Sequence, residues 1–152
     1  MDILPNEDQL RVRATIDSLE AGLMQHSEEL GLVVGDSDMF PLKHTFVDGL
    51  YIREMSIKKG HFAIGKLQKH EHLWVLLKGK LSVVTESGSG EYEAPCYVTA
   101  KPGEKKVVYA LEDSVFVNIY PNPDNKKDLE DIEHKWIAKS YLEYEEFKQL
   151  KK

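Results

Sequence analysis

Two kinds of hydrophobic spacing divide the chain into a helical segment and a longer segment of short strands. Near the N-terminus, apolar side chains recur at spacings of four, three and four residues, at Val12, Ile16, Leu19 and Leu23. This spacing is typical of one face of an α-helix. Asn6 is the predicted N-cap, with Gln9 as its capping-box partner. We therefore expect a helix over about residues 7–30 that ends near Gly31 and lays its apolar stripe on the sheet.

From Phe40 onward the apolar residues form short alternating or continuous runs. These runs are rich in aromatic and β-branched residues: HTFVDGLYIREMSI, HFAIGKL, HLWVLLKGKLSVVT, PCYVTA, KKVVYAL and SVFVNIY. The runs are separated by turn signals that include Asp48-Gly49, Lys78-Gly79, Ser87-Gly88-Ser89-Gly90 and Pro102-Gly103. Short strands at this spacing indicate an antiparallel sandwich or barrel. No helical pattern interrupts residues 44–120, which argues against a parallel βαβ sheet.

The C-terminal segment returns to helical signals. Pro121 and Pro123 are expected to end the sheet, and Asn125 and Asp128 can open a short helix. Ser140 and Glu143 form a second capping box before YLEYEEFKQL, whose apolar edge would consist of Leu142, Phe147 and Leu150. We expect one domain over residues 1–152, with a helical segment over 1–35, a barrel over 40–121 and a helical tail over 122–152.

Composition and charge exclude several classes of protein. Of the 152 residues, 41% are hydrophobic and 30% charged, which is ordinary for one globular domain. A net charge of −6 argues against a general nucleic-acid binder, which needs a basic face. No apolar run approaches the roughly 18 residues of a membrane span, and Cys96 has no second cysteine to pair with. We expect a cytoplasmic protein without membrane contact.

The segment GKLQKHEHLWVLLKG at residues 65–79 carries the candidate chemistry. It is predicted to form a strand, a tight turn and a second strand that ends at a glycine turn. Residues 72, 74 and 76 share one face of the second strand, so His72 points inward if Trp74 and Leu76 do. A buried histidine needs a partner for each ring nitrogen. That partner is a metal, a ligand or another side chain, and the pattern alone does not choose among them.

Two stretches resemble the motifs of the cupins. GKLQKHEHLWVLLKGKL resembles the first motif, G-x5-H-x-H-x3,4-E-x6-G, and YVTAKPGEKKVVYA resembles the second, G-x5-P-x-G-x2-H-x3-N. The resemblance implies a mainly β protein: a cupin-type antiparallel β-barrel (jelly roll), here with an N-terminal helix and a C-terminal helical tail. Many cupins bind Fe, Mn, Ni or Zn through three histidines and a carboxylate. Longer phrases within residues 40–135 also resemble small cupin-like proteins of tailed bacteriophages, which implies a viral origin.

The departures from these motifs change the expected ligand. Counted back from Gly79, the family's glutamate position holds His72, and its two histidine positions hold Lys66 and Gln68. Counted from Pro102-Gly103, the third histidine position holds Lys106. A lysine there opposes a cation at the centre of the site, because like charges a few ångströms apart cost several kcal/mol at low dielectric. The same ammonium suits an anion.

We therefore predict a pocket that binds a small polar or anionic molecule without a cofactor, in a module with no or weak catalytic activity. The predicted pocket residues are Lys66, Gln68, His72, Trp74, Lys106, Asn118 and Tyr120. One alternative is a metal-dependent oxygenase, isomerase or lyase. In it a divalent transition metal is held by His70 and His72, with His61 or Glu71 as further ligands.

A third hypothesis is a structural role in the virion or the capture of a host protein. The helical flanks suit contacts between subunits, and pairing protects the edges of sheets. We therefore expect a homodimer or a higher homo-oligomer, located in the host cytoplasm or in the virion.

Overall fold

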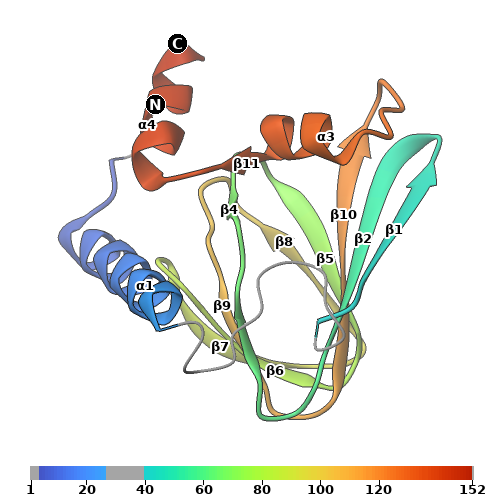
Figure 1. Ribbon diagram of the computed structural model, residues 1–152, viewed down its shortest axis with the longest axis horizontal. Coiled ribbons are helices and arrows are strands. Elements are labelled where there is room, and N and C mark those ends of the chain that lie inside the picture. Colours follow the sequence, from blue (N-terminus) through green and yellow to red (C-terminus); the bar gives the residue numbers. More distant parts are fainter. Residues whose placement is uncertain (1–3, 27–39, 152) are drawn as a thin grey trace.

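The computed structural model describes residues 4–26 and 40–151 (Figure 1). Helix α1 (Glu7–Gln25) begins as predicted, because the side chain of Asn6 accepts a hydrogen bond from the backbone N–H of Gln9 and the reciprocal bond is also present. The helix ends at Gln25, with His26 as its C-cap, and so stops before the predicted end at about residue 30; Gly31 itself lies outside the described residues. None of the described helices has the length and apolar character that a bilayer crossing requires.

The predicted apolar stripe of α1 is only partly correct. Ile16 is buried, but Leu19 is 41% exposed. Charged side chains hold the helix instead: Arg13 pairs with Glu86 and, at 2.8 Å, with Glu145. An ion pair between Arg13 and two carboxylates fixes the rotation of the helix and leaves Leu19 facing solvent.

The strands form two larger antiparallel sheets that face each other, with a small sheet at one end (Figure 1). The five-stranded sheet contains, in order, β1 (Leu42–Val47), β2 (Gly49–Ile57), β10 (Ser114–Asn122), β5 (His72–Lys78) and β8 (Cys96–Ala100). The four-stranded sheet contains β3 (Phe62–Ile64), β9 (Val107–Ala110), β6 (Lys80–Thr85) and β7 (Gly88–Glu93). The third sheet pairs β11 (Ile137–Ala138) with β4 (Leu67–Gln68). The predicted antiparallel barrel is thus confirmed.

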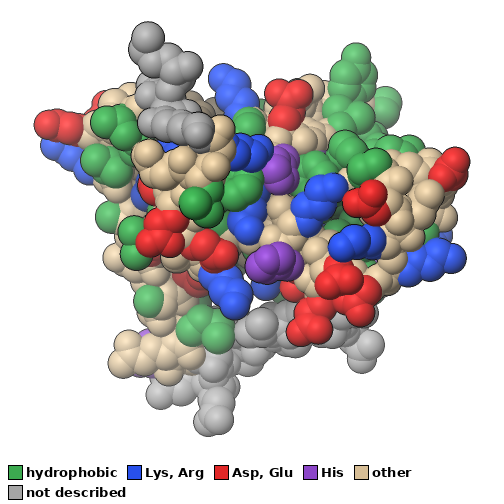
Figure 2. Space-filling model, turned by 90° about the horizontal axis from the view of Figure 1, so that it is seen from above, with side chains coloured by type: hydrophobic (Ala, Val, Ile, Leu, Met, Phe, Trp, Pro, Cys, Tyr) green, Lys and Arg blue, Asp and Glu red, His purple; other side chains and the backbone are tan. Residues whose placement is uncertain are grey.

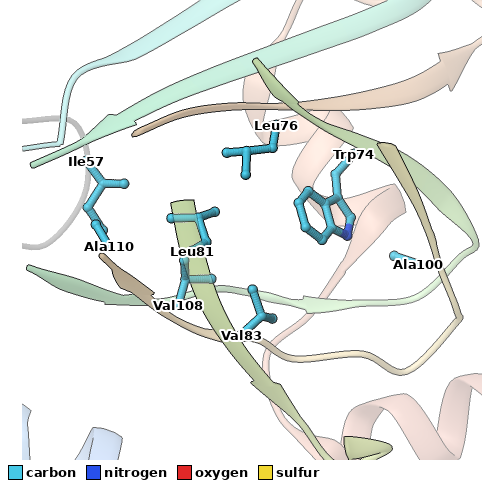
Figure 3. Close-up of a cluster of buried hydrophobic side chains, with 8 residues drawn as sticks. All are labelled: Ile57, Trp74, Leu76, Leu81, Val83, Ala100, Val108 and Ala110. Atoms are coloured by element: carbon cyan, nitrogen blue, oxygen red, sulfur yellow. The ribbon is translucent and has the colours of Figure 1, made fainter. Parts of the chain in front are cut away.

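The hydrophobic core lies between the two larger sheets. Its buried residues are Ile57, Trp74, Leu76, Leu81, Val83, Ala100, Val108 and Ala110 (Figure 3). Along β5 the side chains of His72, Trp74 and Leu76 are buried, whereas those between them are more exposed. The predicted alternation of this strand is confirmed, and it turns His72 into the barrel.

Two motif glycines are required by their backbone and their neighbours. Gly79 has φ +89°, and a Cβ there would clash with the side chain of Ser114 and the carbonyl oxygen of Asp113. Gly103 has φ +85°, and a Cβ there would lie 2.7 Å from the ring of Tyr144. Both positions therefore exclude larger residues on conformational and steric grounds.

The prediction that Ser87-Gly88-Ser89-Gly90 is a turn is wrong beyond its first residue. Strand β7 begins at Gly88 and pairs with β6 from Thr85↔Gly88 to Lys80↔Glu93. Hydrogen bonds of a ladder need only backbone groups, so a glycine-rich segment can extend a hairpin when its partner strand is well formed.

The C-terminal tail begins each helix where it was predicted to. The side chain of Asp128 caps α3 (Leu129–Trp136), and Ser140 caps α4 (Tyr141–Leu150). The predicted apolar edge of α4 is largely wrong, because Leu142 and Leu150 are 70% and 87% exposed while Tyr144 is buried. The contact of Tyr144 with the main chain at Gly103 turns α4 so that this face is inward.

Helix α3 lies over one end of the barrel (Figure 1). Its Ile132 and Trp136 pack with Tyr51 and Tyr120, which belong to the five-stranded sheet. This contact closes part of the barrel end near His72.

Candidate functional site

Polar side chains line the inner face of the five-stranded sheet at the end that α3 covers. The pairing register places Arg53 on β2 opposite Asn118 on β10, and Asn118 opposite Trp74 on β5. One row further along, Tyr51 lies opposite Tyr120. Paired residues of antiparallel strands point to the same face. The register therefore directs these side chains to the same side as Trp74, whose ring lies in the core.

His72 is the histidine among these inward-facing polar residues. It is 3% exposed, and its ring stacks on that of Tyr120 with the centroids 5.2 Å apart. Its Nδ1 lies 3.5 Å from the carbonyl oxygen of His70, which can only accept, so Nδ1 carries the proton and Nε2 is an acceptor. Nε2 is buried and makes no hydrogen bond of good geometry with any described residue, although the side chain of Asn118 lies close enough to act on the pKa of the ring. Burial and the nearby charge of Lys106 lower the pKa of His72 to about 4, so the ring is neutral near pH 7.

Tyr120 connects this group to α3. Its ring stacks on that of Tyr51 at 5.7 Å and tilts against that of Trp136 at 4.9 Å, measured between centroids. Within the described part of the chain its buried hydroxyl makes no hydrogen bond of good geometry, although the side chain of Gln68 lies close enough to act on the pKa of Tyr120. Burial raises the pKa of Tyr120, so the phenol keeps its proton and can donate a hydrogen bond.

Gln68 reaches the same end through the short sheet formed with β11. Its backbone N–H donates to the carbonyl oxygen of Glu104 at 3.0 Å. Its side chain is buried and donates weakly, at 3.5 Å, to the carbonyl oxygen of Lys66. Its Oε1, like the Nε2 of His72 and the hydroxyl of Tyr120, makes no hydrogen bond of good geometry within residues 4–26 and 40–151. Buried polar atoms in this situation ordinarily contact water or a ligand.

Lys106 enters from the opposite sheet, where it directly precedes β9. Its Nζ lies 3.5 Å from Oε2 of Glu104, and both side chains are 15% exposed. The same Nζ lies 6.0 Å from the ring centroid of Trp74, within reach of a cation–π contact. Burial lowers the pKa of Lys106, and the carboxylate of Glu104 counteracts this effect. The lysine is therefore directed inward, and one carboxylate already balances its charge.

Arg53 is the residue that the sequence interpretation missed. Its charge acts to lower the pKa values of four neighbours: Tyr51, His72, Lys106 and Tyr120. Its guanidinium makes no hydrogen bond or ion pair with any residue that the structure describes. The sequence contained a signal that Arg53 points inward. Alternate residues of a strand share a face, and Arg53 lies two residues after Tyr51 and four residues before Ile57, which belongs to the core.

A cavity adjoins Arg53 between β1, β2 and α3. Its walls include the rings of Tyr51, Tyr120 and Trp136, and Glu133 lines it as well. The centres of water molecules can occupy about 60 Å³ of it. One water needs at least ~10–15 Å³, so the cavity has room for more than one water or for a polar group of a ligand.

Some predicted residues lie outside this group. Lys66 is exposed because it precedes the short strand β4. Trp74 belongs mainly to the hydrophobic core and borders the site only through its contact with Lys106. Of the further ligands in the metal alternative, Glu71 is exposed, and the ring of His61 packs edge-on against Phe40 at 6.3 Å.

Comparisons with known proteins bear on the fold. No family model and no curated protein matches this sequence. Ectoine synthase from P. lautus superimposes with a TM-score of 0.52 and 14% identity, over 65% of this chain and 75% of the synthase. KdgF from Halomonas sp. gives a TM-score of 0.50 and 16% identity, over 60% and 88%. A cupin 2 conserved barrel domain protein from Salinispora arenicola CNS-205 gives 0.48 and 13%, over 61% and 91%.

The chain has a cupin fold. Identities this low establish a shared architecture and not a shared activity. The donors present at the inward positions decide whether this barrel end suits a transition-metal ion.

The donors at this barrel end do not fit a transition-metal ion. Among the described residues, no three His, Cys, Asp or Glu side chains lie close enough together to hold one. His70 packs against the rings of Trp136 and Phe147, at 5.0 and 5.3 Å between centroids. His72 offers one neutral nitrogen, but the ammonium of Lys106 acts on it. A divalent cation there would face positive charge with one imidazole as its ligand.

Proposed function

We propose that this chain is a ligand-binding cupin that holds a small anionic molecule at the barrel end beneath α3. The observation that carries the proposal is Arg53, which lines a cavity and has no ion-pair partner among the described residues. A cation withdrawn from water is costly unless an opposite charge reaches it. Arginine binds carboxylate and phosphate groups through two parallel hydrogen bonds, so a ligand of this kind supplies the missing charge.

The neutral groups beside Arg53 suit a ligand that is also polar. Tyr120 lines the cavity, and its hydroxyl can donate a hydrogen bond. His72 stacks on the ring of Tyr120 and Gln68 lies near its hydroxyl, and each offers an acceptor atom next to the cavity wall. Seen onto this end of the molecule, lysine, arginine and histidine side chains gather in the middle of the surface (Figure 2). Positive charge at a concave site raises the local concentration of anions despite an acidic chain.

Titration of the purified protein with short carboxylates and inorganic phosphate tests the proposal. Calorimetry or amide chemical shifts should show millimolar or tighter binding to the wild type. Arg53→Gln should weaken it by about tenfold or more, because the charge-assisted pair is lost. Lys43→Gln, which removes an exposed charge from the neighbouring strand β1, should leave the affinity unchanged. A wild type that binds none of these anions would refute the proposal.

The bacteriophage origin and the homo-oligomeric state belong to the same proposal and rest on the sequence. A solution mass from light scattering at micromolar concentration tests the second, and a strictly monomeric mass would contradict it. Mass spectrometry of purified virions tests whether the protein is carried in a particle or stays in the host cytoplasm.

A further inference from the structure

A second unpaired charge lines the cavity that Arg53 borders. Glu133 on α3 is exposed, and its carboxylate makes no hydrogen bond or ion pair with any described residue. The two charges are therefore too far apart to pair with each other. Both nevertheless act on Tyr51, whose pKa is raised by Glu133 and lowered by Arg53. One small cavity thus carries a positive and a negative group, and neither has a partner among the described residues.

The walls near these charges favour a particular kind of cation. Tyr51, Tyr120 and Trp136 line it with aromatic atoms, and Ile132 adds an aliphatic side chain. Tyr120 stacks on Tyr51 and His72, so of these three rings Trp136 is the one that is not part of such a stack. The face of an aromatic ring attracts ammonium groups, and alkylated ammonium groups also gain from burial against apolar side chains. A carboxylate such as that of Glu133 at the exposed side reinforces this preference.

We infer that the ligand is a small zwitterion whose carboxylate pairs with Arg53 and whose ammonium lies against the aromatic walls beside Glu133. This inference rests on the anion site proposed above and specifies the class of its ligand. A zwitterion supplies both missing charges at once. A simple anion leaves Glu133 facing a like charge, and a simple cation leaves Arg53 without a partner.

Two probes of the same shape isolate the contribution of the ammonium. Glycine betaine and 3,3-dimethylbutyrate differ only in that a quaternary carbon replaces the quaternary nitrogen, so only the first is a zwitterion. Calorimetric titration of the wild type should show about tenfold tighter binding of betaine. Glu133→Gln should abolish this preference and leave the affinity for dimethylbutyrate equal or higher. Glu130→Gln, at an exposed position of the same helix, should retain the preference.

The outcomes separate this inference from the anion proposal. Equal affinities, or tighter binding of dimethylbutyrate, overturn the zwitterion and leave the anion site standing. Binding of inorganic phosphate at Arg53 without binding of betaine would also overturn the zwitterion and leave the anion site standing. A preference for betaine that persists in Glu133→Gln also overturns the assignment of the ammonium to that carboxylate. If no anion and no zwitterion binds, both proposals are wrong.

Discussion

Acid should destabilise this protein through His72 more than through an ordinary histidine. The ring is buried, and its pKa falls from an ordinary value near 6.5 to about 4 in the folded chain. Between these two values the unfolded chain binds a proton that the folded chain excludes. Unfolding is therefore favoured progressively as the pH falls from about 6.5 to about 4, and the stabilising effect of the neutral ring is fully present above that window.

The size of the effect follows from the displacement of the pKa. One pKa unit corresponds to about 1.4 kcal/mol, so the full displacement corresponds to about 3 kcal/mol. Most of it is expressed by pH 4.5, where we expect His72 to have lowered the free energy of unfolding by about 2 to 3 kcal/mol relative to pH 7. That is a large share of the stability of a domain of this size.

Urea unfolding of the wild type and of His72→Gln at pH 7 and at pH 4.5 measures this effect. Carboxylates titrate in both proteins, so the informative quantity is the loss of stability in the wild type minus the loss in the variant. His134→Gln, which removes an exposed histidine from α3, should lose as much as the wild type. If His72→Gln shows the same dependence on pH as the wild type, His72 titrates normally and the burial argument is wrong.

Three further predictions concern the barrel and its helix, each measured as a free energy of unfolding in urea. Gly79→Ala should cost about 3 kcal/mol or more, whereas Gly49→Ala, with φ +77° and open space around it, should cost about 1 kcal/mol; similar costs would contradict the predicted clash. Leu76→Ala should cost about 2 to 5 kcal/mol, and Leu77→Ala, at a side chain 55% exposed, less than about 0.5 kcal/mol. Arg13→Met should cost about 3 kcal/mol, because the nearly buried carboxylate of Glu86 loses its partner, whereas Glu145 keeps Lys148; an unchanged stability would show that α1 does not depend on this ion pair.

Elements that depend on local rules could be predicted from the sequence. The alternation of β5 places His72 with two core residues, and it needs no knowledge of the partner strands. The caps at Asn6, Asp128 and Ser140 depend on hydrogen bonds within four residues. Gly79 marked the end of β5 because the motif requires a left-handed residue there. In each case the determining interaction lies within a few positions along the chain.

The rest of the site depends on contacts between distant segments. Arg53 faces the same side as Asn118 only because β2 and β10 pair in one register. Lys66 was assigned to the pocket by counting, but Leu67, Gln68 and Lys69 are buried in succession, so alternation does not hold across β4. The pairing of β4 with β11, about 70 residues away, sets that geometry. No spacing rule within residues 65–79 could have predicted it.

The charge at this end of the barrel depends on a few side chains. The hydrophobic packing beneath them does not depend on which residues stand at these positions. Ile57, Leu76 and Leu81 fill the core below the site and are almost completely buried. At the inward positions above this core, Gln68 and Lys106 can therefore replace an imidazole or a carboxylate without disturbing the barrel. The fold and the ligand can then vary independently. In the proposed anion site, a neutral His72 would act in a way that metal coordination prevents. Its Nε2 lone pair could accept a hydrogen bond from a polar ligand, whereas a metal would occupy that lone pair.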